Sequence, residues 1–285
     1  MSQISNIDCT YDSYQRLVSF YEEQKDKWFE TVNVELRGWF AANMSAALGA
    51  TLDILQDNLN NIEFSHIDPA IETILLKNEF LTYYGFSKID DNYRTTVRFK
   101  KLKTTDGKHF SQYVKEELLG RQELPQMSPL LKEKMAEAIY EIFVNAQIHS
   151  NTQYIYTCGQ FYPKENKIEF TIVDTGIGFK RKVNERFGSN LSSVQAIQWA
   201  VKDKSTTKEG ITGGIGLALL KEFIKLNNGR MQIASGDGFY QFDKLQEWAK
   251  PFKGSFPGTI VNLQFRTDDH SSYILKNEVD PNEIF

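Results

Sequence analysis

Apolar residues in the first hundred positions alternate between helical and strand spacing, and this alternation limits the possible folds more than any other feature of the sequence. Apolar residues have helical spacing around residues 14–21, and an extended stretch follows around 32–36. Helical spacing returns around 44–55, and a second extended stretch follows around 61–64. Strands that alternate with helices are typical of an α/β unit. We therefore expect a small α/β domain in residues 1–105.

The alternation continues for two more elements before a polar turn interrupts it. Asp68 followed by Pro69 is a helix start signal, and Val97 and Phe99 alternate with charged residues as in a strand. The sequence TTDGK at 104–108 is polar and contains a turn dipeptide. A domain boundary is therefore expected between residues 103 and 110.

Beyond this turn the order of elements changes, because one long helix is followed by two strands, two helices and a final group of strands. We expect helices at about 129–149, 192–202 and 214–226, and strands at about 153–162, 167–173, 231–235, 239–242 and 259–265. Ser192 and Gln195 have the spacing of a capping box, and the sequence Asn227-Asn228-Gly229 is a C-cap signal. The predicted fold class is α+β, with a two-layer α/β sandwich in residues 106–270 and a tail in residues 271–285.

The last predicted strand is expected to separate apolar from polar side chains on its two faces. The residues expected to point inward are Val261, Leu263 and Phe265, and those expected to point outward are Asn262, Gln264 and Arg266.

Composition excludes several classes of protein. The 285 residues carry 33 Lys+Arg and 37 Asp+Glu, a net charge of −4, and no basic block, so nothing indicates nucleic-acid or anionic-membrane binding. Cys9 and Cys158 are the two cysteines, too few for a disulfide framework, and no zinc-ligand spacing is present. The first residues lack signal-peptide features, and the apolar helix at 41–55 carries polar residues. We expect a cytoplasmic protein.

The long helix carries the first group of residues that could do chemistry. Glu137, Glu141, Asn145 and His149 are four residues apart and share one helical face. Asn145 could offer an oxygen to Mg²⁺, and Glu141 could orient or deprotonate a water. The alternative interpretation is an ordinary solvated face beside the apolar one.

Two glycine-containing motifs follow. Asp174-Thr175-Gly176-Ile177-Gly178 comes at the end of a strand, where a carboxylate could accept a hydrogen bond from a ligand amino group; the alternative is a surface turn. Thr212-Gly213-Gly214-Ile215-Gly216-Leu217 opens a helix, where backbone N–H groups could bind an anion; the alternative is a flexible entry loop. It is no P-loop, because no Gly-Lys-Ser/Thr follows the glycines.

In this order, together with Gly258-Thr259 on the final strand, the motifs resemble those of the Bergerat-fold (GHKL) ATPases, over about residues 110–268. That superfamily includes gyrase B, heat-shock chaperone ATPases, histidine kinases, MutL proteins and anti-sigma-factor kinases. The resemblance implies ATP and Mg²⁺ as cofactors and residues 203–213 as a lid. It implies these roles: Asn145 for Mg²⁺, Asp174 for the adenine amino group, Gly176 and Gly178 for the adenine pocket, Thr212, Gly213, Gly214 and Gly216 for phosphate, and Thr259 for the adenine end.

Departures from the family patterns limit which members the chain resembles. Gyrase-like and MutL-like enzymes use a lysine from a following domain, which we do not expect in a chain that ends at Phe285. His66 and His109 do not head the H-E-x-x-x-P pattern of a histidine-kinase phosphoacceptor. Residues 1–105 resemble a STAS-like signalling module, but Asp68-Pro69-Ala70 stands where such modules carry a phosphorylated Ser or Thr, and Ser65 lies earlier.

The expected function is a slow ATPase whose nucleotide state gates an interaction with a protein partner that the sequence does not identify. The alternative is a protein kinase, anti-sigma-factor-like or histidine-kinase-like, that phosphorylates a separate partner. Glu141 fits either chemistry, since one carboxylate can activate water or a hydroxyl. A homodimer is compatible with both.

Overall fold

The computed structural model describes residues 2–149, 152–202 and 215–278. Its first part is a parallel sheet in the order β1-β2-β3. Its elements are β1 (Ser2–Ile7), α1 (Tyr11–Gln24), β2 (Thr31–Phe40), the 3₁₀ turn η1 (Ala42–Met44), α2 (Ser45–Asp57), β3 (Asn61–Ile67), α3 (Pro69–Lys77) and a second 3₁₀ turn, η2 (Phe80–Tyr84). The predicted alternation of strands and helices is confirmed.

The second part is built on a five-stranded antiparallel sheet in the order β4-β6-β7-β9-β8. Its strands are β4 (Thr96–Lys103), β6 (Tyr154–Tyr162), β7 (Lys167–Asp174), β8 (Arg230–Asp243) and β9 (Glu247–Arg266). The strand predicted around Val97–Phe99 is present as β4. It pairs with β6, however, and not with the strands that precede it in the sequence. The chain is therefore a mixed α+β protein.

Helices cover one face of the large sheet and enclose an apolar core. They are α4 (Gly107–Tyr113), α5 (Pro129–His149), α6 (Gly178–Phe187), α7 (Ser193–Ala200) and α8 (Ile215–Leu226). The short elements between and after them are η3 (Val114–Leu118), β5 (Gln126–Met127), η4 (Pro163–Glu165), β10 (Ser272–Tyr273) and η5 (Lys276–Glu278). Phe143 of α5 stacks on Phe110 of α4 with ring centroids 4.7 Å apart, and both are fully buried with Val261, Leu263 and Phe265.

Local signals set several helix ends as predicted. Ser192 and Gln195 form a capping box at the start of α7. After α8, the Asn227 N–H donates to Phe223 O and the Gly229 N–H donates to Ile224 O. Asp68 occupies the N-cap position of α3 with Pro69 at N1, but its carboxylate accepts hydrogen bonds from the Gly38 N–H and from His66 and does not cap the helix.

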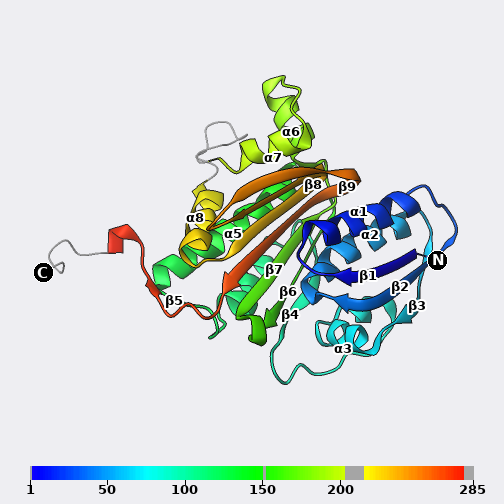
Figure 1. Cartoon of the computed structure of the whole chain (residues 1–285), viewed down its shortest axis with the longest axis horizontal. Coiled ribbons are helices and arrows are strands. Elements are labelled where there is room, and N and C mark those ends of the chain that lie inside the picture. Colours follow the sequence, from blue (N-terminus) through cyan, green and yellow to red (C-terminus); the bar gives the residue numbers. More distant parts are fainter. Residues whose placement is uncertain (1, 150–151, 203–214, 279–285) are drawn as a thin grey trace, which may run out of the picture.

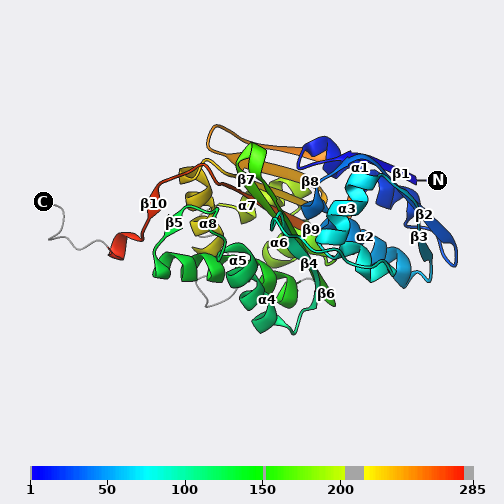
Figure 2. The ribbon, with the colours of Figure 1, turned by 90° about the horizontal axis from the view of Figure 1, so that it is seen from below.

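The opposite face of the large sheet is covered by α1 and α2, which lie between it and the small parallel sheet (Figures 1 and 2). The order of layers is thus small sheet, α1 and α2, large sheet, and then the layer of α5 and α8. This arrangement overturns one prediction. Asn262, expected to point outward, is 0% exposed because the α1–α2 layer covers that face. Gln264 and Arg266 lie farther along β9 and are half-buried.

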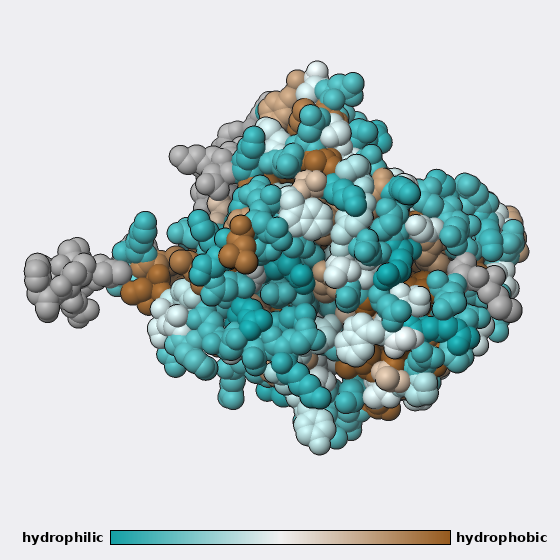
Figure 3. All heavy atoms as spheres, viewed as in Figure 1, coloured by the Kyte–Doolittle hydropathy of each residue, from teal (hydrophilic) through white to brown (hydrophobic). Residues whose placement is uncertain are grey.

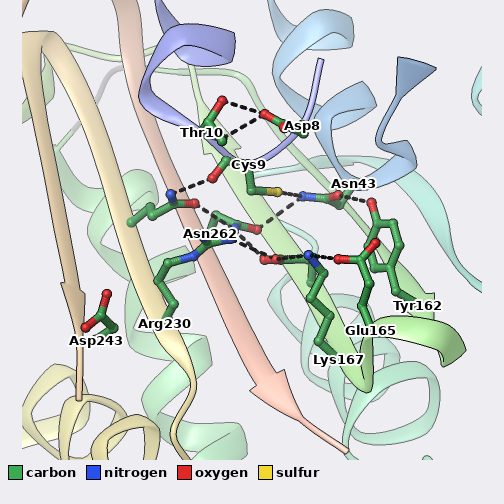
Figure 4. Close-up of polar contacts among 12 residues, drawn as sticks. Asp8, Cys9, Thr10, Asn43, Tyr162, Glu165, Lys167, Arg230, Asp243 and Asn262 are labelled. Carbon is green, nitrogen blue, oxygen red and sulfur yellow. Dashed lines mark hydrogen bonds and ion pairs between the residues drawn. The ribbon is translucent and has the colours of Figure 1, made fainter. Parts of the chain in front are cut away.

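Polar side chains fill the centre of the interface between the two parts (Figure 4). Asn43 Nδ2 lies 2.9 Å from Thr171 Oγ1 and 3.2 Å from Asn262 Oδ1. Asn262 Nδ2 donates to Glu169 Oε2 at 2.8 Å, and the fully buried Glu169 forms an ion pair with Arg230 at 3.1 Å. A buried carboxylate is tolerated here because cations and hydrogen-bond donors surround it.

The predicted tail begins as an attached segment. β10 pairs in parallel with β5, and Ser128 Oγ donates to Glu278 Oε2 at 2.6 Å. The face of the molecule in Figure 3 is mostly hydrophilic, with scattered apolar side chains. Within the described part of the chain, no helix combines the length and apolar character needed to cross a membrane.

Candidate functional site

The candidate site is built around Asp174, the last residue of β7. Ile168, Phe170 and Ile172 point into the α5 core, and the two-residue period of the strand places Asp174 on the same face. Thr259 of β9 is its directly paired neighbour on one side, and Ser235 of β8 is in turn paired with Thr259. Three polar side chains thus lie in a row across three adjacent strands.

Hydrogen bonds connect this row to the start of α6. Ser235 Oγ and Thr259 Oγ1 are 3.1 Å apart, and the Phe179 N–H donates to Ser235 Oγ at 3.0 Å. Ser235 is 1% exposed and Thr259 is 7% exposed. Ser235 was not among the residues expected from the sequence. Its position depends on the register between β8 and β9, which no local pattern reveals.

The glycines of the Asp174 loop act first on the loop itself. The Gly176 N–H donates to Asp174 Oδ1 at 2.8 Å and fixes one carboxylate oxygen. Gly178 has φ +69°, and a Cβ atom there would be 2.7 Å from Ser235 Oγ. The missing side chain therefore lets α6 begin directly against β8, an intramolecular close approach that the sequence alone did not indicate.

Burial raises the pKa of Asp174 to about 6, although the hydrogen bond from Gly176 and the charge of Lys182 act in the opposite direction. At neutral pH the carboxylate is therefore mostly ionised while it is partly withdrawn from water. A carboxylate in this state is a strong acceptor for a ligand N–H group.

Helix α5 supplies the second set of predicted residues. Glu137 is exposed and pairs with Lys134 at 2.6 Å, as a solvated helical face would. Glu141 and Asn145, one and two turns later, are half-buried. Thr152, three residues after the end of α5, has its Oγ1 2.9 Å from Thr175 Oγ1 in the Asp174 loop. This contact joins Thr152 to the loop that follows β7.

The predicted phosphate-binding motif falls mostly outside the described residues. Thr212, Gly213 and Gly214, and the predicted lid at 203–213, lie there. Gly216 lies in the first turn of α8, which begins at Ile215, close to the predicted start of that helix. The structure therefore brings together Asp174, Gly176, Gly178 and Thr259, and the predicted phosphate-binding residues Thr212, Gly213 and Gly214 lie outside the described residues.

The side chains of the site offer single oxygen and hydroxyl groups for hydrogen bonds. Within residues 2–149, 152–202 and 215–278, no cluster of three or more His, Cys, Asp and Glu side chains could hold a metal ion. Magnesium is commonly held by one or two protein oxygens together with phosphate oxygens and water, which is compatible with Asn145 as a single ligand. No protein-family model matches the chain, and no curated protein matches its sequence.

Proposed function

We propose that the chain binds Mg²⁺·ATP in a Bergerat-type site and belongs functionally with regulatory ATPases. The observation that carries this proposal is the row of Asp174, Thr259 and Ser235 at the end of β7, with Asp174 held by Gly176 and its pKa raised. An ionised, half-buried carboxylate beside a buried hydroxyl matches the hydrogen-bonding needs of an adenine edge.

The roles proposed for the residues on α5 are those that the resemblance implies, and their position one turn apart is compatible with them. Asn145 would give its side-chain oxygen to Mg²⁺, which supplies charge neutralisation at the phosphates. Glu141 would orient the attacking water, or accept its proton, from the neighbouring turn. In this proposal both side chains act at the phosphate end, while Asp174 and Thr259 hold the base.

The N-terminal part fits a STAS-like regulatory module in its coarse architecture. It has a parallel β-α-β-α-β arrangement with α1 and α2 on the face that meets the large sheet. His66 Nε2 is hydrogen-bonded to Asp68 Oδ1 at 2.8 Å beside α3. Within this proposal the module reads the nucleotide state of the ATPase part and passes it to a protein partner.

A route for such coupling exists in the interface. Asn43 bonds Thr171 of β7 and Asn262 of β9, and each of these lies three residues from Asp174 or Thr259. A nucleotide that shifts the ends of β7 and β9 would therefore act on the hydrogen bonds to η1. Hydrogen exchange with and without a non-hydrolysable ATP analogue tests this. Slower exchange at residues 42–45 in the bound state supports the coupling, and identical exchange contradicts it.

Calorimetry with ATP and Mg²⁺ tests nucleotide binding. Asp174→Ala should weaken binding at least about tenfold, as expected for loss of a hydrogen bond to a charged group. Asp12→Ala, which removes an exposed carboxylate on α1, is the matched control and should bind as the unmodified chain does. Equal affinity in Asp174→Ala, or no binding by the unmodified chain at millimolar ATP, contradicts the proposal.

Phosphate release distinguishes the ATPase from the kinase. Turnover by the purified chain that Glu141→Ala abolishes supports a slow ATPase. Transfer of labelled phosphate to a captured protein, with no release in its absence, supports the kinase alternative. Release that is unchanged in Glu141→Ala contradicts the role given to this carboxylate in both.

A further inference from the structure

A charged cleft of about 200 Å³ lies far from Asp174 in the sequence, at the junction of α3, β4 and η3. One wall is the loop between η2 and β4, which runs beside α3 and β4 in Figure 1. Its lining includes the cations Lys77, Lys88, Arg94, Arg98 and Arg121. A cleft of this size accommodates a small molecule and is smaller than a typical pocket for a drug-sized ligand.

Two of the four carboxylates of the cleft, Asp91 and Glu117, are engaged by close partners within the protein, and the other two are Glu79 and Asp90. Asp91 accepts from the Thr96 N–H at 2.7 Å and from the hydroxyls of Thr96 and Thr95 at 2.9 and 3.0 Å. Burial alone would raise the pKa of Asp91, but these hydrogen bonds outweigh it and hold the pKa below the ordinary value. Glu117 forms a two-donor ion pair with the Arg98 guanidinium. Asp91 is thus engaged through both of its oxygens, and Glu117 through Oε1.

Several cations of the cleft lack such partners. Among the described residues, Lys77 and Arg94 form no ion pair, and Lys88 reaches only Glu79 at 3.8 Å. The lining holds five cations and four carboxylates, and an anion placed between Lys77 and Arg94 would be attracted to both of these unpaired charges.

Arg121 adds a buried donor to the same site. Its side chain is 2% exposed, and its guanidinium donates to the carbonyls of Arg94 and Thr96 and to Glu123. Its Nε is buried and has no hydrogen-bond partner among the described residues. Arg121 thus brings a guanidinium, whose planar fork matches phosphate and carboxylate oxygens, into the lining of the cleft.

We propose that this cleft binds a small oxyanion, a phosphate monoester or a carboxylate, between Lys77, Arg94 and Arg121. The ligand would join α3 and the η2–β4 loop to the edge strand β4, so it would link the N-terminal part to the large sheet. The site shares no residue with the proposed nucleotide site and does not depend on it.

Calorimetric titration with inorganic phosphate, and separately with succinate, tests the site. One of these anions should bind saturably, and which one binds distinguishes a phosphate from a carboxylate ligand. Arg94→Ala and Lys77→Ala should each weaken binding about tenfold, the effect expected for one charged hydrogen bond. Lys108→Ala, an exposed lysine on α4, should leave the affinity unchanged.

The same titration on Asp174→Ala separates this site from the nucleotide site. The affinity of Asp174→Ala for the anion should equal that of the unmodified chain, whether or not the chain binds ATP. The proposal is overturned by the absence of saturable binding with both anions, by equal affinity in Arg94→Ala and Lys77→Ala, or by loss of binding in Asp174→Ala. Arg94 and Lys77 are exposed or half-buried, so both variants are expected to fold.

Discussion

Gly258 lies directly against the backbone of Asp174: a Cβ atom added to Gly258 would be 1.9 Å from the Asp174 carbonyl oxygen. Gly258 also has φ +143°, a conformation that side chains rarely allow. The backbone of β9 just before Thr259 therefore packs directly against the end of β7, where the candidate site begins. A glycine at this position is required by packing within the chain, whatever ligand the site binds.

Gly258→Ala should lower the free energy of unfolding by about 3 kcal/mol or more, because backbone atoms of β7 cannot move aside as a side chain could. Gly188→Ala is the matched control, since Gly188 also has positive φ but has nothing within 4 Å of an added Cβ. It should cost only about 1 kcal/mol of backbone strain. Urea unfolding of both variants measures the difference, and equal losses would contradict the packing argument.

The stability of the protein should depend on pH through Asp174. Its pKa is about 6 in the folded chain, against an ordinary value of 3.8, so the folded state binds this proton more tightly. The stabilising contribution is complete below about pH 4 and is lost as the pH rises through about 6.

Asp174→Asn, which stays neutral, should therefore gain stability relative to the unmodified chain between pH 4 and pH 7. The two pKa units correspond to a gain of up to about 3 kcal/mol. Urea unfolding at several pH values measures it. A difference between the two proteins that does not change with pH would show that burial does not perturb this carboxyl.

The interface between the two parts offers a comparison of two carboxylates that share one lysine. Lys167 pairs with Glu165, whose side chain is 57% exposed, and with Glu169, whose side chain is 0% exposed. Glu169→Ala leaves Arg230 and Asn262 without their buried partner and should cost about 3 kcal/mol or more. Glu165→Ala should cost less than about 1 kcal/mol. Denaturant unfolding measures the loss of unfolding free energy in each variant. Similar losses in Glu169→Ala and Glu165→Ala would mean that the buried network contributes little to stability.

Gln15 of α1 should protect the backbone of β9 around Lys253, where residues 252–255 have no strand partner within the described part of the chain. Its side-chain amide donates to Lys253 O at 2.8 Å and accepts from the Lys253 N–H at 2.7 Å, as a neighbouring strand would. Gln15→Ala should speed hydrogen exchange of the Lys253 amide and cost about 1 kcal/mol per lost hydrogen bond. Glu23→Ala, an exposed change on the same helix, should alter neither. Unchanged exchange in Gln15→Ala would show that the Lys253 amide is protected by other contacts.

Local signals were sufficient for most helices and strands, because caps, turns and apolar spacing act within a few residues. The capping box of Ser192 and Gln195 and the position of Asp68 before Pro69 were both predicted and are present. The use of the Asp68 carboxylate was not predicted, because its partner, the Gly38 N–H, comes from another strand. Burial of Asn262 was missed for the same kind of reason, since the helices that cover it lie more than two hundred residues earlier in the sequence.

The sequence by itself determined the alternating elements of the first part, the long helix α5, and the positions of Asp174 and the glycines near it. Tertiary structure alone decided that β4 joins the large sheet, that α1 and α2 cover its second face, and that Ser235 lies beside Thr259. Spacing and capping report interactions between residues close in sequence. Strand register and layer order depend on burying faces that are far apart in the chain, and no local pattern records which face meets which.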